Sequence, residues 1–383
     1  MQSHNLMPIT PRPEVIMARG AGSYLWDEAG NRYLDFLQGW AVNCLGHSAQ
    51  EVTEALTQQS ATLLTPSPAY HNRPQLTLAE HLCALTGMHQ AHFLNSGAEA
   101  NEAAIKLARK WGRLNRDGAY QVLTTTNAFH GRTLATMAAS GKPGWEEMFP
   151  PYPDGFAKVA FGDLAAMERA INDKTVAIMV EPVQGEAGVV VPPPEYLRGL
   201  RDLADQHKLL LIFDEIQTGC GRLGHLFAFQ KYAVEPDVLT VGKGLGGGLP
   251  ISAVLANSAA ACFEYGEQGG TFNGNPLVCA VALAVLEVIA DEQFLASVRS
   301  LEAHLSAALN KLCLEHQLKE VRGAGLLFAL KLDGEYANEV VERARQAGLL
   351  INAARPDVLR FMPSLRVTEA EIDACIATLA DVL

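Results

Sequence analysis

The stretch Val238-Leu239-Thr240-Val241-Gly242-Lys243-Gly244 joins a short apolar run to a lysine that lies between two glycines. Its apolar part has the length of a strand and lacks the alternation seen in strands with one exposed face. Two similar runs precede it, at residues 176–180 and 209–213, and residues 195–207 between them carry leucines at helical spacing. Strands buried on both faces and linked by helices predict a parallel sheet in an α/β domain.

Each of the three predicted strands leads into a residue that can take part in chemistry. Glu181 follows the first strand, Asp214 the second and Lys243 the third. Because ligands bind at the carboxyl ends of parallel strands, we expect the three to share a site. Taken singly, each has a plain structural reading as a helix cap, a surface ion-pair partner or a solvated loop residue. Together they favour a site in which burial lowers the pKa of Lys243 toward the neutral amine that forms imines.

Residues 242–247 also satisfy the G-x-G-x-x-G pattern of dinucleotide-binding proteins. That pattern requires a helix behind it, whereas residues 251–255 read Ile-Ser-Ala-Val-Leu and predict a strand. Gly244 also stands where a P-loop has Ser or Thr. We expect the anion site at Ser96-Gly97-Ala98, before a predicted helix at 99–111, because free N–H groups at a helix N-terminus bind phosphate. An ordinary Ser96 N-cap gives the same pattern.

Composition excludes several classes of protein. The formal net charge of −12 argues against nucleic-acid or anionic-membrane partners, and the longest apolar stretch, 277–290, is too short to span a bilayer. The 7 cysteines are scattered without a Cys-x-x-Cys pair and predict reduced thiols, and the N-terminus resembles no secretory signal, so we expect a cytoplasmic protein. His89 and His92 have metal-like spacing but no third ligand nearby, so we expect no metal site.

The 383 residues exceed what one core usually holds, so two domains are expected. After about residue 283 the pattern changes to a long helix, strands around 326–332 and a helix at 337–347. We predict an N-terminal arm with part of a smaller domain at 1–45, a large domain at 46–282, and the C-terminal part of the smaller domain at 283–383.

Five ordered motifs resemble the class III (ω-amino acid) aminotransferases of pyridoxal-phosphate (PLP) fold type I, most closely the acetylornithine aminotransferase group. They are NSGAEANEAA at 95–104, AFHGRT at 128–133, EPVQGE at 181–186, FDEIQTG at 213–219 and TVGKG at 240–244. The resemblance implies PLP as cofactor and a large domain with a mainly parallel central sheet. It also implies a smaller α+β domain built from both chain ends, and a homodimer with shared active sites.

The resemblance also implies roles for single residues in holding the cofactor. Lys243 would bind PLP as a Schiff base and carry a proton between the substrate carbon and the cofactor, with Asp214 on the pyridine nitrogen and Glu181 beside them. The remaining cofactor contacts would be Phe129 stacked on the ring, Gln217 at the phenolic oxygen, Ser96, Gly97 and Ala98 at the phosphate, and Thr271 at the phosphate of the neighbouring subunit.

For the substrates, Arg132 resembles the arginine that binds a substrate carboxylate, and Arg360 the one that receives the α-carboxylate of glutamate or 2-oxoglutarate. Glu186 resembles the acid that neutralises Arg360 while the ω-amino substrate is bound. The plainer readings are a surface-turn arginine for Arg132 and a structural ion pair for Glu186 and Arg360.

The leading hypothesis is transfer of the δ-amino group of N2-acetylornithine to 2-oxoglutarate, which yields N-acetylglutamate 5-semialdehyde and glutamate in arginine biosynthesis. Trp40 stands where ornithine aminotransferases have a tyrosine, which disfavours free ornithine, and Gly270 replaces a serine common in acetylornithine enzymes. Alternatives are ω-aminotransferases acting on 4-aminobutyrate, succinylornithine, ornithine or a diamine, and an aminomutase of the glutamate-1-semialdehyde type. A PLP- or nucleotide-binding module without turnover remains a further alternative.

Overall fold

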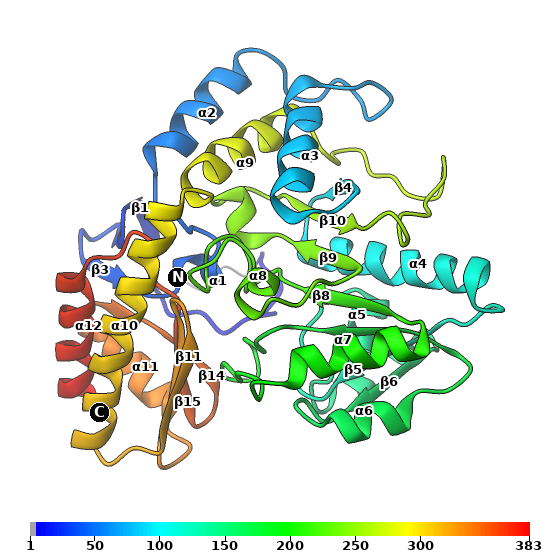
Figure 1. Cartoon of the computed structure of the whole chain (residues 1–383). Helices are drawn as coiled ribbons and strands as arrows, with labels where there is room; N and C mark the ends of the chain where they lie inside the picture. Colours follow the sequence, from blue (N-terminus) through cyan, green and yellow to red (C-terminus); the bar gives the residue numbers. More distant parts are fainter. Residues whose placement is uncertain (1–4) are drawn as a thin grey trace.

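A central sheet of seven strands organises the computed structural model, which describes residues 5–383 (Figure 1). The strand order is β4-β10-β9-β8-β7-β5-β6, and β10 alone runs antiparallel to its neighbours. The predicted mainly parallel sheet is therefore confirmed. Its strands are β4 (Gln90–Leu94), β5 (Gln121–Thr125), β6 (Phe156–Val159), β7 (Thr175–Val180), β8 (Leu210–Asp214), β9 (Val238–Val241) and β10 (Ser252–Ala256).

The sheet is buried on both faces because successive strand residues point to opposite sides. Ile178, Leu211 and Phe213 contribute to one hydrophobic core, whereas Met179 and Ile212 contribute to a second. Helix α4 (Gly97–Asn115) covers the second core with an alanine-rich face, and α7 (Tyr196–His207) packs against β7 and β8. This burial explains why the three strands read as continuous apolar runs.

Shorter helices and turns fill the connections around the sheet. Helices α2 (Gln50–Ser60), α3 (Arg73–Thr86) and α9 (Pro276–Ile289) pack on one another above the sheet in the view of Figure 1. The other connecting elements are α1 (Gln38–Ala41), α5 (Leu134–Ala139), α6 (Leu164–Ala170), α8 (Ala228–Tyr232) and the 3₁₀ turns η1 (Trp145–Glu147) and η2 (Lys243–Gly246). Because η2 leads to strand β10 and not to an α-helix, the glycine-rich segment is not a dinucleotide-binding turn.

Both chain ends contribute to two smaller four-stranded sheets, at the left of Figure 1. The N-terminal strands β1 (Met17–Ala21), β2 (Tyr24–Asp27) and β3 (Arg32–Asp35) are joined by β13 (Leu349–Leu350), which runs parallel to β3. The second sheet is antiparallel, with order β11-β12-β15-β14, and helices α10, α11 and α12 accompany it. Their bounds are β11 (Glu320–Ala324), β12 (Leu327–Lys331), β14 (Asn352–Arg355), β15 (Val358–Phe361), α10 (Glu292–Glu315), α11 (Ala337–Gln346) and α12 (Glu369–Val382).

The two proposed domains share one continuous hydrophobic core. Phe213 and Leu255 of the central sheet belong to the same buried cluster as Leu305 and Phe361 of the C-terminal region. The boundary proposed at 282/283 lies within α9, so we now propose the junction after α9 as the better position for it. Within residues 5–383, no helix combines the length and apolar character needed to cross a membrane.

Candidate active site

A cavity of about 260 Å³ opens at the carboxyl ends of β7, β8 and β9. Nine of the predicted site residues line it, so the three strand ends do meet as the sheet geometry requires. These nine are Gly97, Ala98, Phe129, Arg132, Glu181, Glu186, Asp214, Gln217 and Lys243. Ser96, Trp40, Arg360 and Thr271 lie outside the lining.

Asp214, the last residue of β8, is held by a buried network of hydrogen bonds. Its Oδ2 accepts from Nδ2 of Asn101 and pairs with Nδ1 of His130, both at 2.7 Å. The backbone N–H of Ile216 donates to Oδ1 at 3.1 Å. Thr240 on β9 donates to Oδ1 of Asn101 at 2.8 Å and so fixes the amide that faces Asp214. The carboxylate is only 3% exposed, and its orientation is set from three elements of the fold.

His130 is the basic side chain of this network. Burial disfavours the charged imidazole, but the hydrogen bond and negative charge of Asp214, together with Glu181, outweigh it and raise the pKa of His130. Its Nε2 is buried without a hydrogen-bond partner among the described residues. Because an ionised carboxylate can only accept, Nδ1 of His130 donates to Asp214. The contact with Asp214 therefore favours the charged imidazole of His130 inside the protein.

Glu181 ties together two loops of the cavity wall. Its Oε1 accepts the backbone N–H of Phe129 at 2.8 Å, and its Oε2 accepts that of Gly185 at 3.2 Å. Burial raises the pKa of Glu181 to about 7, against the opposing effect of His130. Both carboxylate oxygens are thus engaged with the backbone.

Lys243 occupies a backbone conformation uncommon for a residue with a side chain, with φ of 43°. Burial lowers the pKa of its amine, as expected from the sequence, while Glu186, Asp214 and Glu181 oppose that shift. Packing requires the glycine that follows Lys243, because a Cβ on Gly244 would lie 2.9 Å from Cβ of Cys220. Close approach of the Cys220 side chain, rather than room for a ligand, therefore requires this glycine.

The N-terminus of α4 stands at one side of the cavity. Ser96 is its N-cap and forms a capping box with Glu99, so the plain structural reading of this serine holds. Gly97 and Ala98 in the first turn line the cavity with backbone N–H groups that have no partner within the helix. A Cβ on Gly97 would meet Cγ2 of Ile216 at 2.8 Å, which explains the glycine.

Arg360 and Glu186 form an ion pair beside the cavity. Nη1 of Arg360 lies 2.7 Å from Oε1 of Glu186 and 2.9 Å from the carbonyl oxygen of Gly185, and Nε donates to Asn352 at 3.2 Å. Nη2 is buried without a partner within residues 5–383. Although burial opposes ionisation, Arg360, Lys243 and Lys142 lower the pKa of Glu186 to about 2. The guanidinium carbon lies 5.4 Å from the ring centroid of Trp40.

The other predicted residues differ in their surroundings. Phe129 contacts the ring of Trp145 edge-on at 5.7 Å, and the guanidinium of Arg132 lies 5.2 Å from the same ring. Nε2 of Gln217 contacts Sδ of Met362 at 3.7 Å. Thr271 is exposed on the loop between β10 and α9, which projects at the right of Figure 1. Thr271 thus makes no part of the cavity in its own chain.

The sequence predicted no place in the site for four residues near the cavity, namely Asn101, His130, Thr240 and Lys142. Asn101 could have been found, because it is a polar residue on the buried, alanine-rich face of α4. His130 stood within a quoted motif, yet its partner is 84 positions away and depends on how β8 packs against the loop.

A family model for the class III aminotransferases matches residues 9–383. The chain belongs to this family. An acetylornithine aminotransferase 2 of Bordetella bronchiseptica is 51% identical over 381 residues, which cover 99% of this chain and 96% of the relative. A succinylornithine transaminase of Yersinia pseudotuberculosis is 45% identical over 387 residues, covering 98% and 94%. An ornithine aminotransferase structure from Toxoplasma gondii, with PLP in partial occupancy at its active site, superimposes with a TM-score of 0.93 at 34% identity, covering 98% and 91%.

This class III aminotransferase is a PLP-dependent enzyme, and its cavity offers the donor set that PLP needs. Lys243 would supply an amine for the aldehyde, Asp214 a buried acid for the ring nitrogen, and the first turn of α4 free N–H groups for the phosphate. Within residues 5–383, no three His, Cys, Asp or Glu side chains are grouped to hold a metal ion.

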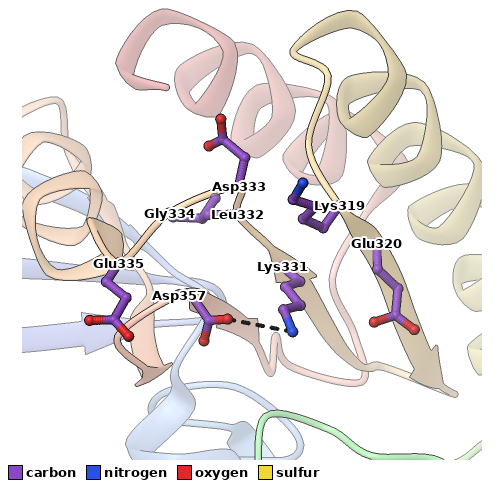
Figure 2. A pocket seen from close by; sticks show the side chains of 8 residues that line it. All are labelled: Lys319, Glu320, Lys331, Leu332, Asp333, Gly334, Glu335 and Asp357. Atoms are coloured by element: carbon purple, nitrogen blue, oxygen red, sulfur yellow. Dashed lines mark ion pairs between the residues drawn. The ribbon is translucent and has the colours of Figure 1, made fainter.

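A second depression, of about 590 Å³, lies at the end of β12 in the C-terminal sheet (Figure 2). Figure 2 shows acidic and basic side chains around it, with Nζ of Lys331 3.5 Å from Oδ2 of Asp357. None of the predicted site residues lines this depression, which is open and of mixed charge. The predicted site residues lie instead at the cavity formed by the strand ends.

Proposed function

We propose that this aminotransferase moves the δ-amino group of N2-acetylornithine to 2-oxoglutarate, forming N-acetylglutamate 5-semialdehyde and glutamate in arginine biosynthesis. The observation that carries the proposal is the Glu186–Arg360 ion pair, 2.7 Å long, beside the cavity that contains Lys243. An arginine that can be neutralised and released suits an enzyme whose two substrates differ by one carboxylate. An aminomutase, which returns the amine to the same molecule, has no need of such a device.

In the proposed reaction PLP, when bound, accepts the electrons left by removal of a proton from the substrate carbon. Lys243 would hold the cofactor and then carry that proton on its Nζ. Asp214, fixed by Asn101 and His130, would be the partner of the ring nitrogen. Glu181 has both oxygens engaged by backbone N–H groups, so we assign it to positioning the Phe129 and Gly185 loops and not to proton transfer.

The proposed substrate contacts follow from Nη2 of Arg360. A carboxylate that binds an arginine side-on needs two guanidinium nitrogens; Glu186 occupies Nη1, while Nη2 has no partner in the described part of the chain. Departure of Glu186 would expose both to the α-carboxylate of glutamate or 2-oxoglutarate. Arg132, exposed near the cavity mouth, would bind the carboxylate of the ω-amino substrate. We place Phe129 on the ring, Gln217 at the phenolic oxygen, and Ser96, Gly97 and Ala98 at the phosphate.

We further propose a cytoplasmic homodimer. Thr271 lies on an exposed loop that also carries the exposed apolar side chains of Phe272 and Tyr265, as expected for a loop that reaches into a neighbouring subunit. All seven cysteines are free, in keeping with a reducing compartment.

A coupled assay with purified protein tests the substrate. Acetylornithine with 2-oxoglutarate should yield glutamate faster than ornithine, 4-aminobutyrate or putrescine does. Succinylornithine is the second candidate, favoured by the 45% identical relative that acts on it. If acetylornithine gave no glutamate while another amine gave it readily, the proposed amino donor would be wrong. An absorbance band that disappears on borohydride treatment and in Lys243→Ala tests the proposed lysine separately.

A further inference from the structure

Lys142 is a second basic neighbour of Glu186, in addition to Arg360. It belongs to the loop between α5 and η1, and its Nζ is 3.7 Å from Oε2 of Glu186, while Oε1 of the same carboxylate lies 2.7 Å from Arg360. Glu186 therefore stands between two cations but is bonded closely to only one of them. Among the described residues Glu186 is the one acidic ion-pair partner of Lys142.

The surroundings of Lys142 make it an available partner. The side chain is 22% exposed, and its ammonium lies 5.4 Å from the ring centroids of both Phe129 and Trp145. Burial lowers the pKa of Lys142, and the charges of Arg355, Arg132 and Arg360 add to that effect, while Glu186 opposes it. A lysine surrounded by aromatic rings and other cations gains from any closer approach of a carboxylate.

The proposed reaction requires Glu186 to leave Arg360 when a dicarboxylate arrives. Glu186 is three-quarters buried, so a carboxylate released without a new partner would be costly. A rotation of the Glu186 side chain that brings Oε2 about 1 Å closer to Nζ would turn the 3.7 Å contact into an ordinary charge-assisted hydrogen bond to Lys142. Neither the lysine nor the backbone has to move for this exchange.

We propose that Lys142 is a positioning residue that receives Glu186 when Arg360 is taken by glutamate or 2-oxoglutarate. This inference rests on the proposed exchange at Arg360. It gives Lys142 a task in one half-reaction only, because with the ω-amino substrate bound Glu186 stays on Arg360. Removal of the charge at Lys142 should then slow the half-reaction with the dicarboxylate and leave the half-reaction with the ω-amine nearly unchanged.

The experiment compares holoenzymes carrying Lys142→Met, Lys142→Arg, Glu186→Gln and the pair Lys142→Met/Glu186→Gln. Each half-reaction is followed by itself through the cofactor absorbance, with glutamate alone or with the best ω-amine of the wild type alone. For Lys142→Met we expect kcat/KM for glutamate to fall about tenfold, within the usual range of coupling between two groups, and that for the amine to change less than twofold. Lys142→Arg should restore most of the loss.

Two further measurements separate positioning from other roles. Binding of glutarate, a dicarboxylate that lacks a reactive group, should weaken about as much as the glutamate half-reaction. In the Glu186→Gln background, Lys142→Met should have no additional effect, because no carboxylate remains to be received. Equal slowing of both half-reactions, or an undiminished effect in that background, would overturn the proposal. A wrong donor assignment would appear separately, as a wild type that does not react with acetylornithine.

Discussion

Nδ1 of His130 lies 2.7 Å from Oδ2 of Asp214, and both side chains are almost fully removed from solvent. A buried carboxylate without a compensating charge is costly, and the raised pKa of His130 favours the charged imidazole beside it. We therefore propose the pair as part of the cofactor site, although only the acid was assigned from the sequence.

Replacement of His130 by Phe should lower kcat more than it raises the KM for either substrate. Phenylalanine keeps the ring volume but removes the donor and the charge, so Asp214 keeps Asn101 as its remaining side-chain partner within 3 Å. Breaking a buried charged pair costs about 3–5 kcal/mol, and we expect at least a tenfold loss of kcat together with weaker PLP binding. Steady-state kinetics and PLP titration of the apoprotein measure both.

The control is Thr240→Val, which removes a hydroxyl from the same network while preserving shape. Thr240 lies 3.5 Å from Asp214 and acts mainly through Asn101, so its loss should be smaller. If Thr240→Val proved as harmful as His130→Phe, the charge of His130 would not be the deciding factor.

Gly185→Ala should displace Gln217 without unfolding the protein. A Cβ at position 185 would lie 1.5 Å from Oε1 of Gln217, the far end of a flexible side chain that can turn away. We therefore expect a shifted cofactor absorbance band and reduced kcat, with little change in the melting temperature. The double variant Gly185→Ala/Gln217→Ala should be no worse than Gln217→Ala alone. Additive losses would mean that Gly185 acts through another contact, such as its carbonyl bond to Arg360.

The fold was predictable because the information is local. Residues 176–180, 209–213 and 238–241 are apolar without alternation, and a strand covered on both faces requires no more. Their polar ends then meet by the geometry of parallel strands, which is why Glu181, Asp214 and Lys243 were placed together. The substrate residues came from resemblance alone: Arg360 and Trp40 are 320 positions apart, and no local pattern indicates that one packs on the other.

What the sequence did not provide are contacts that depend on packing between elements. The Asn101–Asp214–His130 network joins a helix, a strand end and a loop, and each member alone resembles a cap or a turn residue. The reason for Gly244 likewise lies in Cys220, which approaches it only after folding. Lys142 belongs to no quoted motif, and its relation to Glu186 depends on where two loops meet.

Glu215→Gln should reduce the dependence of stability on pH. Both oxygens of Glu215 accept backbone N–H groups at the start of α8, and burial raises its pKa from 4.5 to about 7. The folded protein then holds a proton that the unfolded chain releases between these values, so this group stabilises the fold below pH 4.5 and loses that contribution as pH rises through 7. The amount is roughly 3 kcal/mol.

Urea unfolding at fixed PLP concentration from pH 4 to 8 measures the effect, and the variant should show a shallower decline above pH 4.5. Glu342→Gln is the control, and its difference from the wild type should stay constant above pH 4.5. Its neighbour Arg345 lowers the pKa of Glu342 to about 2, so its contribution is present above pH 4.5 and is lost as pH falls toward 2. Parallel curves for the wild type and Glu215→Gln would show that folding does not change the pKa of Glu215.

Trp40→Tyr should admit free ornithine. The Trp40 ring is half exposed, has a left-handed backbone with φ of 67° and lies over Arg360, so a tyrosine would keep an aromatic face on the guanidinium and add a hydroxyl. A hydrogen bond to a charged group contributes about 1.5–3 kcal/mol, so kcat/KM for ornithine should rise about tenfold or more relative to acetylornithine. Competition between the two donors measures the ratio directly.

Trp40→Phe provides the matched ring without the hydroxyl and should give no such gain. If Phe and Tyr improved ornithine equally, the smaller ring and not the hydroxyl would set the choice of donor, and the tryptophan would act by filling space.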